Sequence, residues 1–168
     1  ATHKWRAAAW VVAGSPGMTG AAHLATRAAQ RAGAGYVRLS TPGSEADPWA
    51  PTEAVVTELP GAGWADEVLT GTSRFAALAV GPGLGGSPGA VAQVRRLVAA
   101  ADIPTVVDGD GLRALGGDAA GLIARRPSAD APVVLTPHDG EFEALTGAPP
   151  EADRFEAVRR LAVATGAV

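Results

Sequence analysis

The sequence predicts an α/β fold of three layers, in which a mostly parallel sheet carries helices on both faces. Short valine-rich runs bounded by Gly or Pro alternate with longer segments of helical periodicity. Several of the short runs are apolar throughout, as in strands that helices cover on both sides. Because such alternation favours right-handed crossovers, we expect the strands to run parallel. The 168 residues are expected to form one domain, spanning residues 1–168.

Strands are predicted where apolar, largely valine-rich runs lie between turn residues. The runs are residues 9–13, 36–40, 54–58, 76–80, 105–108 and 132–136. Residues 42–60 are rich in proline, acidic and small side chains. We therefore expect them to form an excursion at one edge of the sheet.

Helices are predicted over residues 21–32, 88–101 and 154–165, where apolar residues recur at helical spacing. Gly33 and Gly35 are expected to end the first of them. The apolar faces assigned to the three helices are, in order, Ala21, Leu24, Ala25, Ala28 and Ala32; Val91, Val94, Leu97 and Val98; and Val158, Leu161 and Ala162.

Composition excludes several classes of function. Apolar residues make up 47% of the chain, which argues against disorder, and the net charge of −3 gives no electrostatic reason to expect nucleic acid or an anionic membrane as partner. Lys4 is the only lysine, so no phosphate loop ending in Gly-Lys-Ser/Thr and no interior Schiff-base lysine is present. The chain has no cysteine, which fits a reducing compartment, and we expect a cytoplasmic location. No apolar run approaches the ~20 residues that span a bilayer.

Four turns, each following a predicted strand, carry the residues that indicate a function. In an open parallel sheet the carboxyl ends of the strands share one edge, and the loops leaving that edge form the ligand crevice. We therefore expect the four turns to converge on one site. They are Gly14-Ser15-Pro16-Gly17-Met18-Thr19-Gly20, Gly81-Pro82-Gly83-Leu84-Gly85-Gly86, Asp108-Gly109-Asp110-Gly111 and Thr136-Pro137-His138-Asp139-Gly140-Glu141.

The first two turns are rich in glycine. The first runs into a helix, whose free amides and positive dipole end can bind an anion, although an ordinary strand-to-helix turn explains the spacing equally well. Its glycines at 14, 17 and 20 do not match the dinucleotide pattern G-x-G-x-x-G. Ser15 lacks the G-x-S-x-G context of a hydrolase nucleophile. The glycine density of the second turn favours close approach of backbone to a ligand, or else a flexible loop.

The other two turns carry acids and a histidine. Asp108 and Asp110 at the end of a strand suit magnesium–phosphate contacts or proton transfer, but Asp110 is more simply explained as the cap of a helix beginning at Gly111. His138 beside Glu141 can position and polarise a hydroxyl or a phosphate, and we favour a functional role for it. His23, on the first helix, is expected to be a surface residue.

Taken in order, these motifs resemble the NAD(P)H-hydrate dehydratases, carbohydrate-kinase-like repair enzymes with a ribokinase-like fold. The resemblance rests on the first, second and fourth turns, on Val106-Val107-Asp108, and on Arg31-Ala32-Gly33-Ala34-Gly35-Tyr36-Val37-Arg38. It implies a lyase that removes water from hydrated NADH or NADPH at the expense of ADP or ATP. The ring hydroxyl is phosphorylated and phosphate is then eliminated. A homo-oligomer and a fused or cooperating NAD(P)H-hydrate epimerase are also implied.

The resemblance further implies roles for individual residues. Ala21, Gly83 and His138, together with Gly17 and Gly20, would contact the hydrated dinucleotide. Asp108 and Glu141 would be catalytic, close to Mg²⁺ or to the phosphoryl group that is transferred.

Two departures from the family pattern are present. Asp108-Gly109-Asp110-Gly111 stands where the family has Asp-Ala-Asp-Ala, and the family continues past Val168 into a strand ending in Lys-Gly and a Gly-Thr-Gly-Asp turn. The resemblance places the adenine nucleotide site and the catalytic base in that later part. We therefore expect a C-terminally incomplete fold with no nucleotide-binding residue in this chain. Two alternatives stay open, a non-catalytic ligand-binding module of the same fold and a small-molecule hydroxyl kinase, which the Thr-Pro-His turn disfavours.

Overall fold

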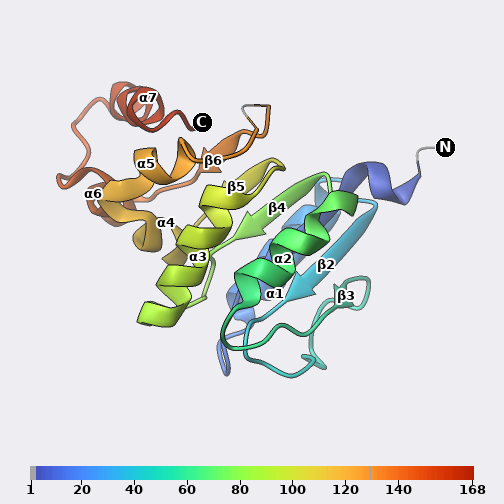
Figure 1. The fold of residues 1–168 in the computed structure, drawn as a ribbon. Coiled ribbons are helices and arrows are strands. Elements are labelled where there is room, and N and C mark those ends of the chain that lie inside the picture. Colours follow the sequence, from blue (N-terminus) through green and yellow to red (C-terminus); the bar gives the residue numbers. More distant parts are fainter. Residues whose placement is uncertain (1–2, 129) are drawn as a thin grey trace.

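The computed structural model of the chain describes residues 3–128 and 130–168. Its centre is a parallel sheet of six strands in the order β3-β2-β1-β4-β5-β6 (Figure 1). Each strand coincides with a predicted run to within a few residues, and the two-residue β3 at one edge lies inside the predicted excursion. The strands are β1 (Ala8–Val12), β2 (Tyr36–Ser40), β3 (Val55–Val56), β4 (Ala77–Val80), β5 (Thr105–Val107) and β6 (Val133–Leu135).

All three predicted helices are confirmed to within one residue at each end, as α1 (Gly20–Arg31), α3 (Pro88–Ala100) and α7 (Arg154–Thr165). Shorter helices occupy connections for which no helix bounds were predicted: α2 (Trp64–Gly71), α4 (Asp110–Leu115), α5 (Ala119–Ile123) and α6 (Asp139–Thr146). Single 3₁₀ turns are η1 (Lys4–Ala7), η2 (Thr72–Arg74) and η3 (Gly116–Asp118). No helix in the described part of the chain is long and apolar enough to cross a membrane.

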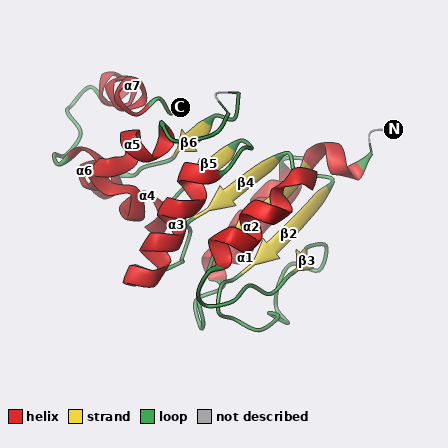
Figure 2. Cartoon of the chain, in the orientation of Figure 1, coloured by secondary structure: helices red, strands yellow, loops and turns green. Residues whose placement is uncertain are grey.

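Helices lie on both faces of the sheet, as predicted (Figure 2). Successive strand residues point to opposite faces, so Trp10 and Val12 pack toward α2 and α3 whereas Val11 packs toward Ala22 of α1. Near the β6 edge the face that α1 covers elsewhere is open, and Val106 of β5 is 37% exposed. Beside β6, the Val168 amide donates to Val133 O at 2.8 Å, and Val168 O accepts from the Leu135 amide at 2.9 Å.

The predicted buried face of α1 was wrong. Leu24 is 71% exposed, and the buried residues of the helix are Ala22 and Thr26. These small side chains lie against the valines and leucines of β1 and β2, so the helix backbone approaches the sheet closely. The same correction applies in part to α7, where Leu161 is buried as predicted but Val158 is 48% exposed.

Candidate active site

The strand order reverses between β1 and β4, and this switch point opens the crevice in which doubly wound sheets bind ligands. The loop after β1 runs toward α1 on one face, and the loop after β4 runs toward α3 on the other. The two loops meet, because the Gly14 amide donates to Pro82 O at 2.8 Å. A Cβ atom placed on Gly83 would lie 3.3 Å from Cβ of Ala21, so two residues predicted to contact substrate are neighbours.

Close packing between loops explains Gly81, the first glycine of the second turn, whereas a Cβ on Gly85 or Gly86 would meet nothing within 4 Å. Gly81 has φ +125°, and a Cβ there would lie 2.0 Å from Asp108 O and 2.8 Å from the backbone of Gly111. No other residue fits that position. Gly17 and Gly20 differ, because a Cβ on either would meet nothing within 4 Å. Both are exposed.

Asp110 does not cap α4, contrary to our prediction. The helix begins at Asp110 itself, its N-cap is Gly109, and no side chain makes a capping hydrogen bond there. Instead, Asp110 Oδ2 accepts from the Gly85 amide at 2.8 Å. The carboxylate therefore ties the turn after β5 to the turn after β4. Sequence alone did not indicate this contact, because the two residues are 25 positions apart.

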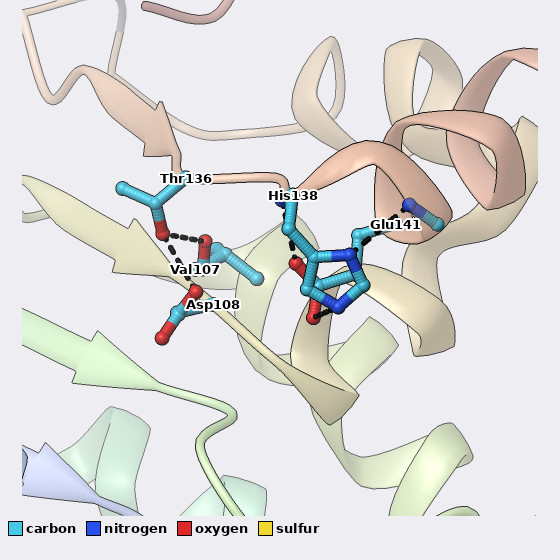
Figure 3. Close-up of polar contacts among 6 residues, drawn as sticks. Val107, Asp108, Thr136, His138 and Glu141 are labelled. Atoms are coloured by element: carbon cyan, nitrogen blue, oxygen red, sulfur yellow. Dashed lines mark hydrogen bonds and ion pairs between the residues drawn. The ribbon is translucent and has the colours of Figure 1, made fainter. Parts of the chain in front are cut away.

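Asp108 is held by Thr136, a residue that sequence reasoning did not single out. Thr136 Oγ1 donates to Asp108 Oδ1 at 2.9 Å, across the ends of β5 and β6 (Figure 3). This hydrogen bond orients the carboxylate and leaves Oδ2 without a partner among the described residues. Hydrogen bonds thus connect the first turn to the second, the second to the third and the third to the fourth. The predicted convergence of the four turns at one edge of the sheet is confirmed.

His138 forms the N-cap of α6 together with Glu141. His138 Nδ1 accepts from the Gly140 amide at 3.0 Å, and Glu141 Oε2 accepts from the His138 amide at 3.0 Å. Since Nδ1 accepts, Nε2 carries the proton, and it lies 3.2 Å from Glu141 Oε1 (Figure 3). The His138 side chain is 63% exposed, whereas that of Glu141 is 6% exposed. Glu141 is therefore a buried support that fixes the tautomer and the ring position of an accessible histidine.

The start of α1 has no side-chain cap. Thr19 makes no side-chain cap for this helix, and no acidic residue lies in its first turn. By contrast, Ser87, His138 and Asp153 cap α3, α6 and α7 with their side chains. The first amides of α1 therefore keep their hydrogen-bonding capacity and the positive end of the helix dipole.

His23 is not a plain surface residue, contrary to our prediction. Its Nε2 lies 2.6 Å from Asp47 Oδ2, and the two side chains are only 18% and 10% exposed. The pKa of Asp47 is lowered, first by the hydrogen bond from the Trp49 amide, and then by the side chains of His23 and Thr19, against the opposing effect of burial. This contact fastens the excursion after β2 to the beginning of α1.

Asp108 and Glu141 differ in how well they would suit Mg²⁺. In proteins this ion usually keeps several waters and takes one or two carboxylates together with substrate phosphates. The free Oδ2 of Asp108 fits that pattern. Both oxygens of Glu141 are already engaged by His138, and no group of three or more His, Cys, Asp or Glu gathers in residues 3–128 and 130–168. The catalytic and metal-binding roles of both residues stay predictions.

These features define a doubly wound α/β domain whose four turns meet at the carboxyl edge of the sheet, around its switch point. Within that class, the chain belongs to the NAD(P)H-hydrate dehydratase family, because the sequence model of that family matches residues 9–168. It is 41% identical over 149 residues to the bifunctional NAD(P)H-hydrate repair enzyme Nnr of Salinibacter ruber, covering 83% of this chain and 27% of that protein. It is 37% identical over 151 residues to the ADP-dependent (S)-NAD(P)H-hydrate dehydratase of Bacillus subtilis, covering 84% of this chain and 48% of that protein.

Solved structures agree with this assignment. The Bacillus subtilis ADP/ATP-dependent NAD(P)H-hydrate dehydratase, co-crystallised with ATP and Mg²⁺, superposes with a TM-score of 0.74 at 29% sequence identity, covering 99% of this chain and 58% of that one. A ribokinase-like superfamily protein of Enterococcus faecalis has the same fold, with a TM-score of 0.73 at 22% identity. The predicted ribokinase-like fold is confirmed. The chain spans about half or less of the length of these curated relatives.

Proposed function

We propose that this chain is part of an NAD(P)H-hydrate dehydratase and forms the side of its active site that binds the hydrated dinucleotide. The observation that carries the proposal is the shared edge of the sheet, at which an uncapped helix start, an oriented aspartate and an accessible histidine follow β1, β5 and β6. Family membership supports the choice of substrate. The reaction is the dehydration of NADH or NADPH hydrate, with ADP or ATP as co-substrate.

The first amides of α1 supply the contacts for the dinucleotide phosphates. Gly17 and Gly20 leave the approach open, because neither position has an atom within 4 Å of an added Cβ. Ala21 and Gly83 form the base of this subsite, where the loops after β1 and β4 touch. A dianionic pyrophosphate placed there gains from the helix dipole and from hydrogen bonds that no protein group competes for.

His138 and Asp108 act on the reacting part of the substrate. His138 presents an accessible ring to the reacting part of the substrate, and its Nε2–H can donate to the ring hydroxyl or the phosphoryl group by exchanging Glu141 Oε1 for the substrate oxygen. Asp108 presents Oδ2 at the same edge, held in place by Thr136. When Mg²⁺ is bound it neutralises the developing phosphate charge, and Asp108 is the residue that would hold it. Glu141 positions His138.

The partners of the proposed enzyme follow from the relatives. The adenine nucleotide is a co-substrate whose binding residues we place outside this chain. An epimerase fused to the protein or working with it, a homo-oligomer and a cytoplasmic location are parts of the same proposal. The bifunctional repair enzymes among the relatives support the epimerase part of this proposal.

A second candidate is a ligand-binding module that binds the dinucleotide without turning it over. It is favoured by the described residues themselves, since no group of three or more His, Cys, Asp or Glu that could hold a metal ion gathers among them. In that case the crevice would bind NADH hydrate and release it unchanged.

The test is a turnover assay with purified NADH hydrate, Mg²⁺ and ADP or ATP, which follows the dihydronicotinamide absorbance. The 168-residue chain is assayed beside a chimera in which the remaining C-terminal part of the Bacillus subtilis dehydratase domain follows Val168. We expect a nucleotide-dependent rise with the chimera that His138→Ala reduces. Binding of NADH hydrate without turnover in either protein would favour the binding module. Neither binding nor turnover would refute the assignment.

A further inference from the structure

The second half of the turn after β4 is held by the side chain of a residue in another turn. The first half is fixed by the sheet, because the Gly81 amide donates to the last carbonyl of β1 at 3.2 Å, and by the core, because Leu84 is buried. Gly85 and Gly86 connect this anchor to α3, and a Cβ on either would meet nothing within 4 Å. The Gly85 amide donates to Asp110 Oδ2 at 2.8 Å. This hydrogen bond therefore fixes a segment that packing leaves free.

Asp110 makes this contact from a rigid base. It is the first residue of α4, a helix whose Leu112 and Leu115 are fully buried. The backbones of the two turns also touch, since a Cβ on Gly109 would lie 3.3 Å from Cα of Pro82. A carboxylate that accepts from a backbone amide forms a charge-assisted hydrogen bond, which is stronger than a bond between neutral groups. The turn after β5 can therefore hold the turn after β4 in one conformation.

The hydrogen bond between Asp110 and Gly85 lies between two groups of the proposed active site. Gly83, two residues before Gly85, is the neighbour of Ala21, because a Cβ on Gly83 would lie 3.3 Å from Cβ of Ala21. Asp108, two residues before Asp110, is the residue that would hold Mg²⁺. One side-chain contact thus joins the turn that would bind the hydrated dinucleotide to the turn that would bind the metal.

We propose that Asp110 is a positioning residue, which holds the segment from Gly83 to Gly85 in the conformation that binds the hydrated dinucleotide. The inference rests on the proposed function and adds to it a residue that acts through the Gly85 amide without touching the substrate. Gly81, Gly83 and Gly85 all have positive φ, and glycines allow such a turn many alternative conformations. Without the hydrogen bond only a fraction of the molecules would hold the binding conformation, and the apparent affinity would fall by that fraction.

The proposal is tested with variants that separate the acceptor oxygen from the charge. Asp110→Asn keeps an oxygen that can accept from the Gly85 amide, whereas Asp110→Ala removes both the oxygen and the charge. The control is Asp118→Asn, which removes an exposed carboxylate paired with Arg95 shortly after α4. Binding of NADH hydrate to each 168-residue protein is measured by calorimetry, and urea unfolding verifies that each variant is folded. Hydrogen exchange followed by NMR reports on the Gly85 amide.

We expect Asp110→Ala to weaken binding of NADH hydrate by between about tenfold and about a hundredfold, as for loss of one hydrogen bond to a charged group. Asp110→Asn should retain most of the affinity, and Asp118→Asn should retain all of it. In the wild type the Gly85 amide should exchange with solvent more slowly than the Gly86 amide, after correction for their intrinsic rates. This difference should persist in Asp110→Asn and disappear in Asp110→Ala.

Unchanged affinity in a folded Asp110→Ala protein would overturn the proposal while leaving the proposed function intact. Equal losses in Asp110→Asn and Asp110→Ala would also overturn it, because the charge would then act directly on Mg²⁺ or on the substrate. A wild-type Gly85 amide that exchanges as fast as the Gly86 amide would overturn it without any variant, which covers the case in which Asp110→Ala does not fold. Absence of binding by the wild type would overturn both proposals together.

Discussion

The substitution Gly81→Ala tests whether close loop packing builds the site. A Cβ at position 81 would lie 2.0 Å from Asp108 O, and contacts of such an atom essentially never fall below 3.0 Å, so the carbonyl must move by about 1 Å. The Asp108 carbonyl accepts from the Gly111 amide at 3.0 Å, and the side chain of Asp108 is the carboxylate that Thr136 orients. The shift therefore disturbs the start of α4 and the proposed catalytic aspartate together.

The expected loss of folding free energy in Gly81→Ala has two parts. A positive φ on a non-glycine residue costs about 1–3 kcal/mol, and overpacking costs about 1–3 kcal/mol more. A loss of about 2–6 kcal/mol is a large fraction of the 5–15 kcal/mol by which domains are typically stable. Urea unfolding monitored by circular dichroism measures the change, with the slope used to check that the unfolding transition is unaltered.

Two glycines serve as controls for Gly81. Gly17→Ala tests the backbone term alone, because its φ is +78° and nothing lies within 4 Å, and we expect about 1–2 kcal/mol. Gly86→Ala has neither a positive φ nor a neighbour, and should change stability by less than about 0.5 kcal/mol. A Gly81→Ala protein no less stable than Gly17→Ala would refute the packing that we describe.

Three further predictions separate structural from functional roles. His138→Asn should leave the folding stability unchanged, because Asn also caps helices, but it should weaken binding of NADH hydrate. His138→Ala should weaken binding as well and should also lower the free energy of unfolding by about 1 kcal/mol. Wild-type affinity in the Asn variant would contradict a substrate role for His138. Because the folded pKa of Asp47 lies below its ordinary 3.8, its contribution to stability is present at neutral pH and is lost as pH falls through the folded value. Unfolding free energies measured toward about pH 2 should therefore fall more for the wild type than for Asp47→Asn, and parallel curves would count against the contact. Burial lowers the pKa of Arg126, whose guanidinium donates to the carbonyls of Val98, Ile103 and Ala131. Arg126→Met should therefore lower the free energy of unfolding by about 3 kcal/mol, whereas Arg125→Ala, at an exposed neighbour, should lower it by less than about 0.5 kcal/mol. Equal losses in the two variants would refute this structural role of Arg126.

Sequence reasoning located the sheet because its strands are continuous apolar runs between glycine and proline. The alternation with helices then gave the parallel topology and the common edge of the four turns. The short helices other than α4 were missed for a physical reason. Segments such as α5 span only five residues and owe their conformation to packing rather than to their own periodicity. In α1 the buried side of the helix consists of small residues. The prediction placed Leu24 on the buried side because of its hydrophobicity, but Leu24 lies on the exposed side.

The candidate site was predicted in outline but not in its contacts. The turns containing Asp108 and His138 were identified, since acids and histidine at strand ends are unusual. Contacts between residues far apart in sequence were not identified, among them Thr136 with Asp108 and Asp110 with the Gly85 amide. Their polar residues have ordinary local explanations, and only the fold brings the partners together. The capping role of His138 was also hidden, because histidine is not a common N-cap residue.

The central claim is that the hydrated dinucleotide binds in the crevice at the switch point. Titration of the ¹⁵N-labelled 168-residue chain with NADPH hydrate, followed by amide NMR spectra, tests it most directly. The account predicts the largest shifts at Gly17, Gly20 and Ala21 and around Gly83 and His138, with saturation at one equivalent. Shifts confined to another place, such as the apolar cavity of about 390 Å³ between α6 and α7 lined by Phe142 and Leu161, or no shifts at all, would contradict it.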